Sequence, residues 1–254
     1  MSGTHHFLTD ERFGTSPIHR LDPRTKILGL VGLTVVSVST PAGAVWAFAL
    51  YAGILLFLLG LSRLPVRFVL RRVAAVLPFV VVVAVFLPFF DRAGGGGYNI
   101  GGVRVSGAGL LVLWNVTAKA ALGVTATTLL AATTSFPELI AGLERLRTPR
   151  LFTLIISFMY RYTFLFVEEF RRMRRAMEAR NFQGRWLWQA AIVGHMVSSL
   201  FLRSYQRGER VYLAMLSRGY DGSMRTAAPL ALRRADTTFL AVLAAVLLAI
   251  RLTA

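Results

Sequence analysis

Apolar positions along the chain gather in long runs, and short polar segments rich in arginine separate them. A helix needs about 20 mostly apolar residues to cross the hydrocarbon core of a membrane, so the first run is rather short. Ser39-Thr40-Pro41 separates it from the second run. The pattern predicts an all-α integral membrane protein with about five transmembrane helices, at residues 27–40, 41–62, 73–90, 110–134 and 237–252.

Two more apolar segments, residues 151–167 and 187–202, are predicted not to cross the membrane. Six Arg and three Glu lie between them in residues 168–185, and arginines also flank the pair on both outer sides. If both segments crossed, this arginine-rich connection would lie outside, against the positive-inside rule. Arg161 within the first segment would also be costly in hydrocarbon. We therefore expect amphipathic cytoplasmic helices here, packed on themselves, on the spans and on a partner.

The predicted organisation has three parts. Residues 1–135 hold a polar N-terminal segment and the first four spans, residues 136–225 form the cytoplasmic helical region, and residues 226–254 hold the last span. The chain is then a multi-pass protein of the cell inner (cytoplasmic) membrane, with its N-terminus and its amphipathic helices in the cytoplasm. Because the first 25 residues lack an apolar core, we expect no cleavable signal peptide.

Composition excludes several other classes of protein. The 254 residues are 55% hydrophobic yet carry a formal net charge of +17. A nucleic-acid-binding protein would spread that charge over a folded surface, whereas here it lies between apolar runs, so no nucleic acid is expected. The glycine-rich segment 94–102 lacks the Lys and Ser or Thr of a phosphate-binding loop and predicts a flexible external loop. We expect no catalytic site, no bound metal and no ATP hydrolysis by this chain.

A nine-residue pattern occurs twice in the arginine-rich region. The first copy, residues 176–184, is AMEARNFQG, and the second copy, residues 214–222, is AMLSRGYDG. On a helix each copy forms one stripe at i, i+3, i+4 and i+7, in which apolar residues lead to an arginine. The stripes are Met173, Ala176, Met177 and Arg180, and Val211, Ala214, Met215 and Arg218.

Each stripe ends at a helix terminus. Asn181 and Gly219 follow the arginines, and these residue types best tolerate the left-handed conformation that closes a helix. One such copy could be a plain capped helix. Two matching copies favour a binding surface, in which methionine adapts to a groove and arginine pairs with a carboxylate. The repeat therefore predicts two equivalent grooves, on a dimeric or pseudo-dimeric partner.

With these motifs the chain resembles the transmembrane T component of energy-coupling factor (ECF) transporters, most closely the CbiQ type that serves cobalt or nickel uptake. The family carries two Ala-Arg-Gly motifs at the ends of two cytoplasmic coupling helices. Ala179-Arg180-Asn181 and Ser217-Arg218-Gly219 each depart from that motif by one residue. SPIHRLDPRTK at residues 16–26 and SFPELIAGLERLRTP at residues 135–149 are also similar to family segments.

The resemblance implies a coupling subunit of an ECF-type ABC importer. Two partner ABC-type ATPases would bind ATP-Mg, and a CbiM-like substrate-binding membrane subunit, with or without a CbiN-like one, would take up cobalt or nickel. The implied ATPase contacts are Arg180 and Arg218, with Ala179, Asn181, Ser217 and Gly219 in the motifs and Ala176, Met177, Ala214 and Met215 on the stripes.

Some alternatives remain open. The chain could be the T component of a vitamin transporter, a stand-alone carrier, or a membrane enzyme acting on lipids, although it has no clustered carboxylates or nucleophile and base pair. Lys119 in the fourth span has either a structural role or a place in an ion path. His5, His6 and His19 belong to a solvated tail or, less favoured, ligate a metal. The lone His195 is expected in the core.

Overall fold

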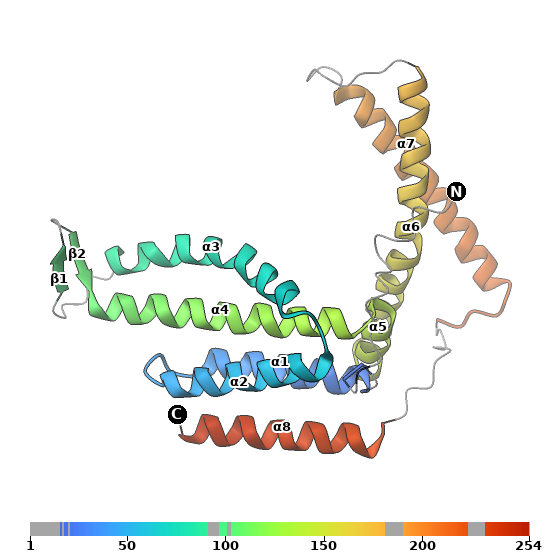
Figure 1. Ribbon diagram of the computed structural model, residues 1–254. Helices are drawn as coiled ribbons and strands as arrows, with labels where there is room; N and C mark the ends of the chain where they lie inside the picture. Colours follow the sequence, from blue (N-terminus) through green and yellow to red (C-terminus); the bar gives the residue numbers. More distant parts are fainter. Residues whose placement is uncertain are drawn as a thin grey trace. The chain divides into compact units, whose positions relative to one another are not determined.

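The structure is a computed structural model in which residues 16, 18–19, 21–90, 97–100, 103–180, 190–222 and 232–253 are described. Its contacts divide the chain into two compact units. The first unit comprises Met1–Gly142 with Leu230–Ala254, and the second comprises Leu143–Pro229. Figure 1 shows the elements in chain order. The predicted all-α class is confirmed, with one short hairpin as an exception.

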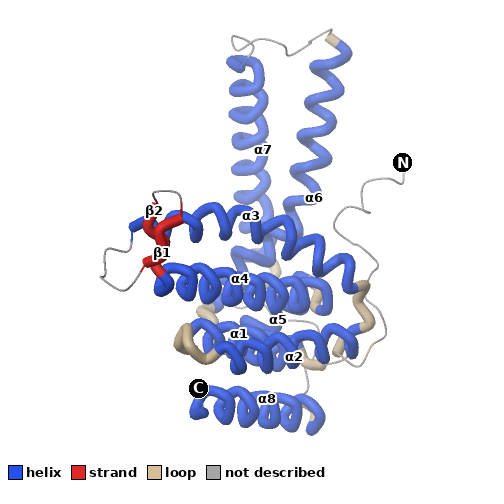
Figure 2. Tube along the Cα trace, turned by 60° about the vertical axis from the view of Figure 1, so that its left-hand side comes forward, coloured by secondary structure: helices blue, strands red, loops and turns tan. Residues whose placement is uncertain are grey.

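The first unit is a layered set of helices built from the apolar runs. Its helices are α1 (Pro23–Ser39), α2 (Val45–Ser62), α3 (Val66–Phe90), α4 (Gly107–Thr133) and α8 (Arg234–Thr253), and α5 (Phe136–Arg145) begins in it. α1 packs against α2, α4 and α8, and α3 packs along α4 (Figures 1 and 2). Leu33, Tyr51, Leu55 and Leu129 are fully buried at the centre. Large apolar side chains on the outer faces, such as Phe57, remain exposed, as expected of surfaces that face hydrocarbon.

Four of the described helices are long and apolar enough to cross a membrane. They are Val45–Ser62, Leu111–Thr133, Arg150–Ala179 and Arg234–Thr253. Three of these helices coincide with predicted spans. The exception is α6 (Arg150–Ala179), which we predicted to be cytoplasmic because of its flanking arginines. That placement and the total of five spans stay predictions.

The glycine-rich segment is not entirely a loop. Gly97–Ile100 forms strand β1, which pairs antiparallel with Val103–Ser106, strand β2. The expectation of a loop across residues 94–102 is therefore wrong for residues 97–100. Tyr98 lies opposite Val105 and Ile100 opposite Val103, and such aromatic and β-branched pairs favour strands.

A buried polar cluster ties α1 to α4 and α8. The Asp22 side chain caps α1 by accepting a hydrogen bond from the Arg24 N–H at 2.9 Å. Asp236 accepts from the backbone N–H of Asp22 at 2.9 Å and from that of Arg233 at 2.8 Å. Lys26 Nζ donates to the carbonyls of His19 at 3.1 Å and Thr133 at 2.9 Å. Asp22 and Lys26 therefore anchor the first unit from within.

The second unit contains α6 (Arg150–Ala179) and α7 (Ala190–Leu216). Its boundary falls inside α5, after Gly142, because this residue packs against Pro23 and Ile27 of the first unit. At the start of α5 the backbone N–H of Ser135 donates to Glu138 Oε2 at 3.1 Å, as in a capping box. The predicted division at residues 135 and 225 follows membrane topology rather than compactness, and it stays a prediction.

Candidate functional site

The two copies of the repeat lie on α6 and α7, which form an antiparallel pair. Glu169 of α6 joins the helices by accepting a hydrogen bond from Arg203 of α7, and it also pairs with Arg172 at 2.7 Å. Partial desolvation of Glu169 would raise its pKa. The hydrogen bond from Arg203 and the charge of Arg172 outweigh this effect and hold the pKa of this carboxyl below its ordinary value. The negative charge that links the helices is therefore retained near neutral pH.

The first copy lies at the C-terminal end of α6. Its helix ends at Ala179, and the N–H of Arg180 donates to the carbonyl of Met177 at 3.0 Å. Ala176, Ala179 and Arg180 are exposed, and Met177 is half-buried. The predicted closing residue of this copy, Asn181, lies outside the described residues.

The second copy closes α7 through a Schellman motif. The N–H of Gly219 donates to Leu216 at 2.9 Å, and the N–H of Tyr220 donates to Met215 at 3.0 Å. Gly219 has φ of +77°, in the left-handed region where an L side chain is strained. Ser217 Oγ donates to the carbonyl of Leu213 at 2.9 Å. The predicted closure at Gly219 is confirmed, and it leaves Arg218 and Ala214 exposed.

The structure does not bring the two copies together. Met215 and Tyr220 line a cavity with Leu151 and Ile155, near the start of α6, whereas Arg180 follows the last residue of that helix. The 30 residues of α6 extend about 45 Å at 1.5 Å per residue. In Figure 1 the end of α7 lies far along α6 from the end that carries Arg180. The two copies are therefore better placed to bind a partner at two separate sites than to form one site together.

Both arginines are available to a carboxylate partner. Arg180 and Arg218 form no salt bridge with any residue in the described part of the chain. Arginine at a helix C-terminus also favours the negative end of the helix dipole. Within the same helix, Arg174 is already paired with Glu178 at 3.0 Å, so exposure alone does not leave an arginine unpaired.

Met215 has a second environment that the sequence did not indicate. It is half-buried and lines an apolar cavity of about 530 Å³ between α6 and α7. Ala214 beside it points outward and is exposed. The assignment of both residues to a partner-binding face stays a prediction, and for Met215 the structure adds a contact with the cavity.

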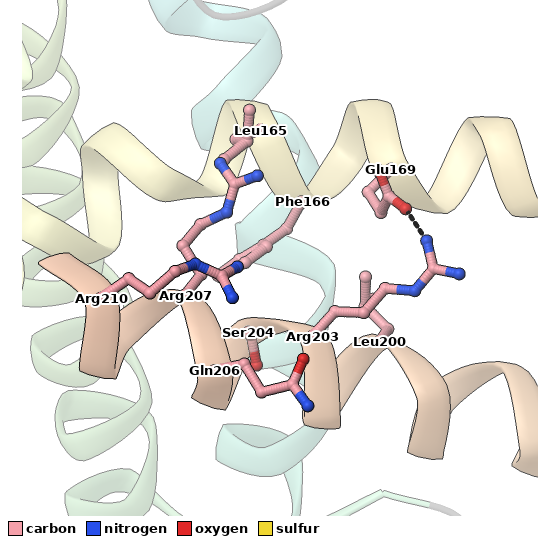
Figure 3. A pocket seen from close by; sticks show the side chains of 9 residues that line it. All are labelled: Leu165, Phe166, Glu169, Leu200, Arg203, Ser204, Gln206, Arg207 and Arg210. Carbon is pink, nitrogen blue, oxygen red and sulfur yellow. Dashed lines mark hydrogen bonds and ion pairs between the residues drawn. The ribbon is translucent and has the colours of Figure 1, made fainter.

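A second pocket in the same unit contains a group of arginines that sequence reasoning missed. Arg203, Arg207 and Arg210 line it from α7, and Glu169 lines it from α6 (Figure 3). Its volume is about 270 Å³. The spacing i, i+4, i+7 places the three arginines on one face of α7. This spacing is visible in the sequence and could have predicted a cluster of positive charge.

The remaining candidate residues fall outside this site. Lys119 is half-buried and donates to the carbonyl of Val38 at 2.7 Å, near the end of α1, which gives it a structural contact. His19 belongs to the buried cluster because its carbonyl accepts the hydrogen bond from Lys26, and its Nδ1 lies 2.6 Å from Ser16 Oγ. His5 and His6 lie outside the described residues. His195 is exposed, so its expected place in the core is wrong. Within the described ranges no three His, Asp or Glu side chains are grouped to hold a metal.

Comparison with known proteins gives a consistent set of matches. Residues 14–228 match the family CbiQ, described as cobalt transport protein. A protein of Listeria innocua named energy-coupling factor transporter transmembrane protein EcfT is 28% identical over 220 residues, which cover 82% of each chain. The protein of the same name in Bacillus subtilis is 27% identical, also over 82% of each chain. A protein of Methanocorpusculum labreanum described as a fused cobalt transport protein, CbiMQ, is 33% identical over 37% of this chain and 16% of its own length.

Proposed function

The chain belongs to the CbiQ family and is a transmembrane T component of an ECF transporter. From that premise we propose that it transmits ATP-driven movement of two partner ATPase subunits to a separate substrate-binding membrane subunit. The ion that the transporter takes up is then cobalt or nickel. The name of the fused CbiMQ relative supports a CbiM-like substrate-binding partner.

The observation that carries this proposal is the placement of the two copies. Each copy ends a long helix with an exposed arginine that has no carboxylate partner among the described residues, and the two ends are far apart on one helix pair. A planar guanidinium binds a carboxylate through two parallel hydrogen bonds, which fixes orientation as well as contact. Two ends of this kind fit two copies of a partner that carries an acidic groove.

Force transmission needs a stiff connection between the two contacts. α6 and α7 are long helices that the Glu169 and Arg203 pair joins, and we expect them to move together when one end is displaced. In this account both helices lie in the cytoplasm, and ATP-Mg is bound by the partner ATPases rather than by this chain. The N-terminus lies on the same side of the membrane.

Charge reversal at the two arginines tests the proposal. The chain would be expressed with its partner ATPase and substrate-binding subunits, and copurification and cobalt uptake would be measured for Arg180→Glu, Arg218→Glu and the double variant. Repulsion from the acidic groove is expected to weaken copurification in each single variant and to abolish it, together with uptake, in the double variant.

Arg171→Glu is the matched control, because Arg171 is an exposed arginine of α6 outside the stripe. It changes the net charge by the same amount as each single variant and is expected to leave copurification and uptake unchanged. Normal copurification and uptake in the double variant would exclude the coupling role of both arginines.

A further inference from the structure

Two cavities between α6 and α7 adjoin each other and differ in chemistry. The first is the pocket of about 270 Å³ that Arg203, Arg207 and Arg210 line. The second is the apolar cavity of about 530 Å³, whose lining includes Leu154, Phe158 and Val211. Phe166, Ser204 and Arg207 line both, so the two cavities share a wall. The larger volume lies within the range of roughly 300–1,000 Å³ typical of ligand sites.

The polar pocket carries excess positive charge. Of its charged residues, Arg203 is paired with Glu169, whereas Arg207 and Arg210 form no ion pair with another described residue. Figure 3 shows Arg203 reaching Glu169, while Arg207 and Arg210 extend from α7 beside Leu165 and Phe166. Like charges on one helix face repel each other, so an anion between them would stabilise the arrangement.

We propose that these two cavities together bind one anionic phospholipid at the cytoplasmic surface of the membrane. The phosphate of its headgroup pairs with Arg207 and Arg210, and an acyl chain occupies the apolar cavity. A free phosphate would use only the first cavity and an apolar helix of a partner only the second, whereas a phospholipid matches both and their junction. Val211 and Met215 of the second stripe also line the apolar cavity, but the inference concerns lipid binding by the chain alone and is tested without the ATPases.

The chain offers a steric test of the apolar half. Gly208 lines the apolar cavity, and a Cβ built there would meet no heavy atom within 4 Å. Gly208→Leu is therefore expected to fold normally and to fill part of the cavity. Gly194 lies in the same helix, has the same open surroundings and lines neither cavity, so Gly194→Leu is the matched control.

The experiment measures lipid retained by the full chain. Protein purified in detergent would be titrated with dioleoylphosphatidylglycerol or dioleoylphosphatidylcholine, and bound lipid counted by native mass spectrometry. Inorganic phosphate would be added as a competitor. Arg207→Gln with Arg210→Gln tests the polar half, and Arg171→Gln with Arg175→Gln, two exposed arginines of α6 outside both cavities, is the charge-matched control.

The proposal predicts one tightly retained phosphatidylglycerol that inorganic phosphate does not displace. Affinity should fall about fivefold for each arginine removed from the pocket. It should fall about tenfold or more in Gly208→Leu, where a leucine displaces acyl chain, and stay unchanged in both controls. Equal retention of the two lipids, displacement by inorganic phosphate, or identical behaviour of the Gly208 and Gly194 variants would overturn it.

Discussion

Lys26→Met is expected to destabilise the first unit strongly. Lys26 is only 3% exposed, and its ammonium donates to two backbone carbonyls, those of His19 and Thr133. The carboxylates of Asp22 and Asp236 lie close enough to interact with its charge. Methionine preserves the apolar stem of the side chain as far as Cε but removes every donor. The variant therefore isolates the ammonium group from the packing of its stem.

The size of the effect follows from what the substitution leaves behind. Each buried carbonyl left without a donor costs about 1–3 kcal/mol. Lys26 serves two carbonyls, so we expect the free energy of unfolding to fall by about 2–6 kcal/mol. Lys119→Met removes a single hydrogen bond, to Val38, from a half-buried lysine and should cost about 1–2 kcal/mol.

The assay is an equilibrium unfolding titration of the full chain in mixed micelles with SDS, followed by far-UV circular dichroism. Lys26→Met and Lys119→Met are compared because these are the two lysines of the sequence. A loss in Lys26→Met no larger than that in Lys119→Met would refute the anchoring role of Lys26.

Three further predictions use the same titration. Gly29→Leu should lower the free energy of unfolding by about 1–3 kcal/mol, because its Cβ would lie 2.9 Å from Leu243 Cδ2, whereas Gly32→Leu meets nothing and should be tolerated. Arg63→Gly should raise it by about 1 kcal/mol, since Arg63 closes α2 at φ of 55°, and a neutral or negative effect would contradict this reasoning. Burial and the nearby charge of Lys26 lower the pKa of His19 below its ordinary 6.5, so the unfolded chain binds that proton more readily. The contribution of His19 to stability should be fully present well above pH 6.5 and be lost as the pH falls through 6.5 and below, and this dependence should weaken in His19→Gln.

Local patterns predicted the helices well because each helix is specified by its own residues. Uninterrupted apolar runs marked α2, α4 and α8, and the break at Ser39-Thr40-Pro41 lies at the end of α1. The closure of α7 at Gly219 was also predictable, since a left-handed residue after an apolar stripe is a local requirement. The helical register of the repeat then placed Arg180 and Arg218 at helix ends.

Features that depend on distant residues could not be predicted. The partner of Lys26 at Thr133 is 107 positions away in the sequence, and Asp22 meets Asp236 across 214 positions. The antiparallel pairing of α6 with α7 likewise decides that Met215 lines a cavity. His195 was assigned to the core from its apolar neighbours, but its face of α7 is left exposed. The pairing of strands 97–100 and 103–106 was missed because the glycines before and between them suggested a loop.

Site-specific crosslinking tests the coupling account most directly, because the chain contains no cysteine. Ala179→Cys and Ser217→Cys would each introduce a unique thiol beside Arg180 or Arg218, to be labelled with a photoactivatable crosslinker in the assembled transporter. Ser39→Cys, at the exposed end of α1 and on the predicted outer side of the membrane, is the control. The account predicts a crosslink to an ATPase subunit from residue 179 and from residue 217, two ATPases when both are labelled, and none from residue 39. Absence of ATPase crosslinks from both helix ends, or equal crosslinking from residue 39, would contradict it.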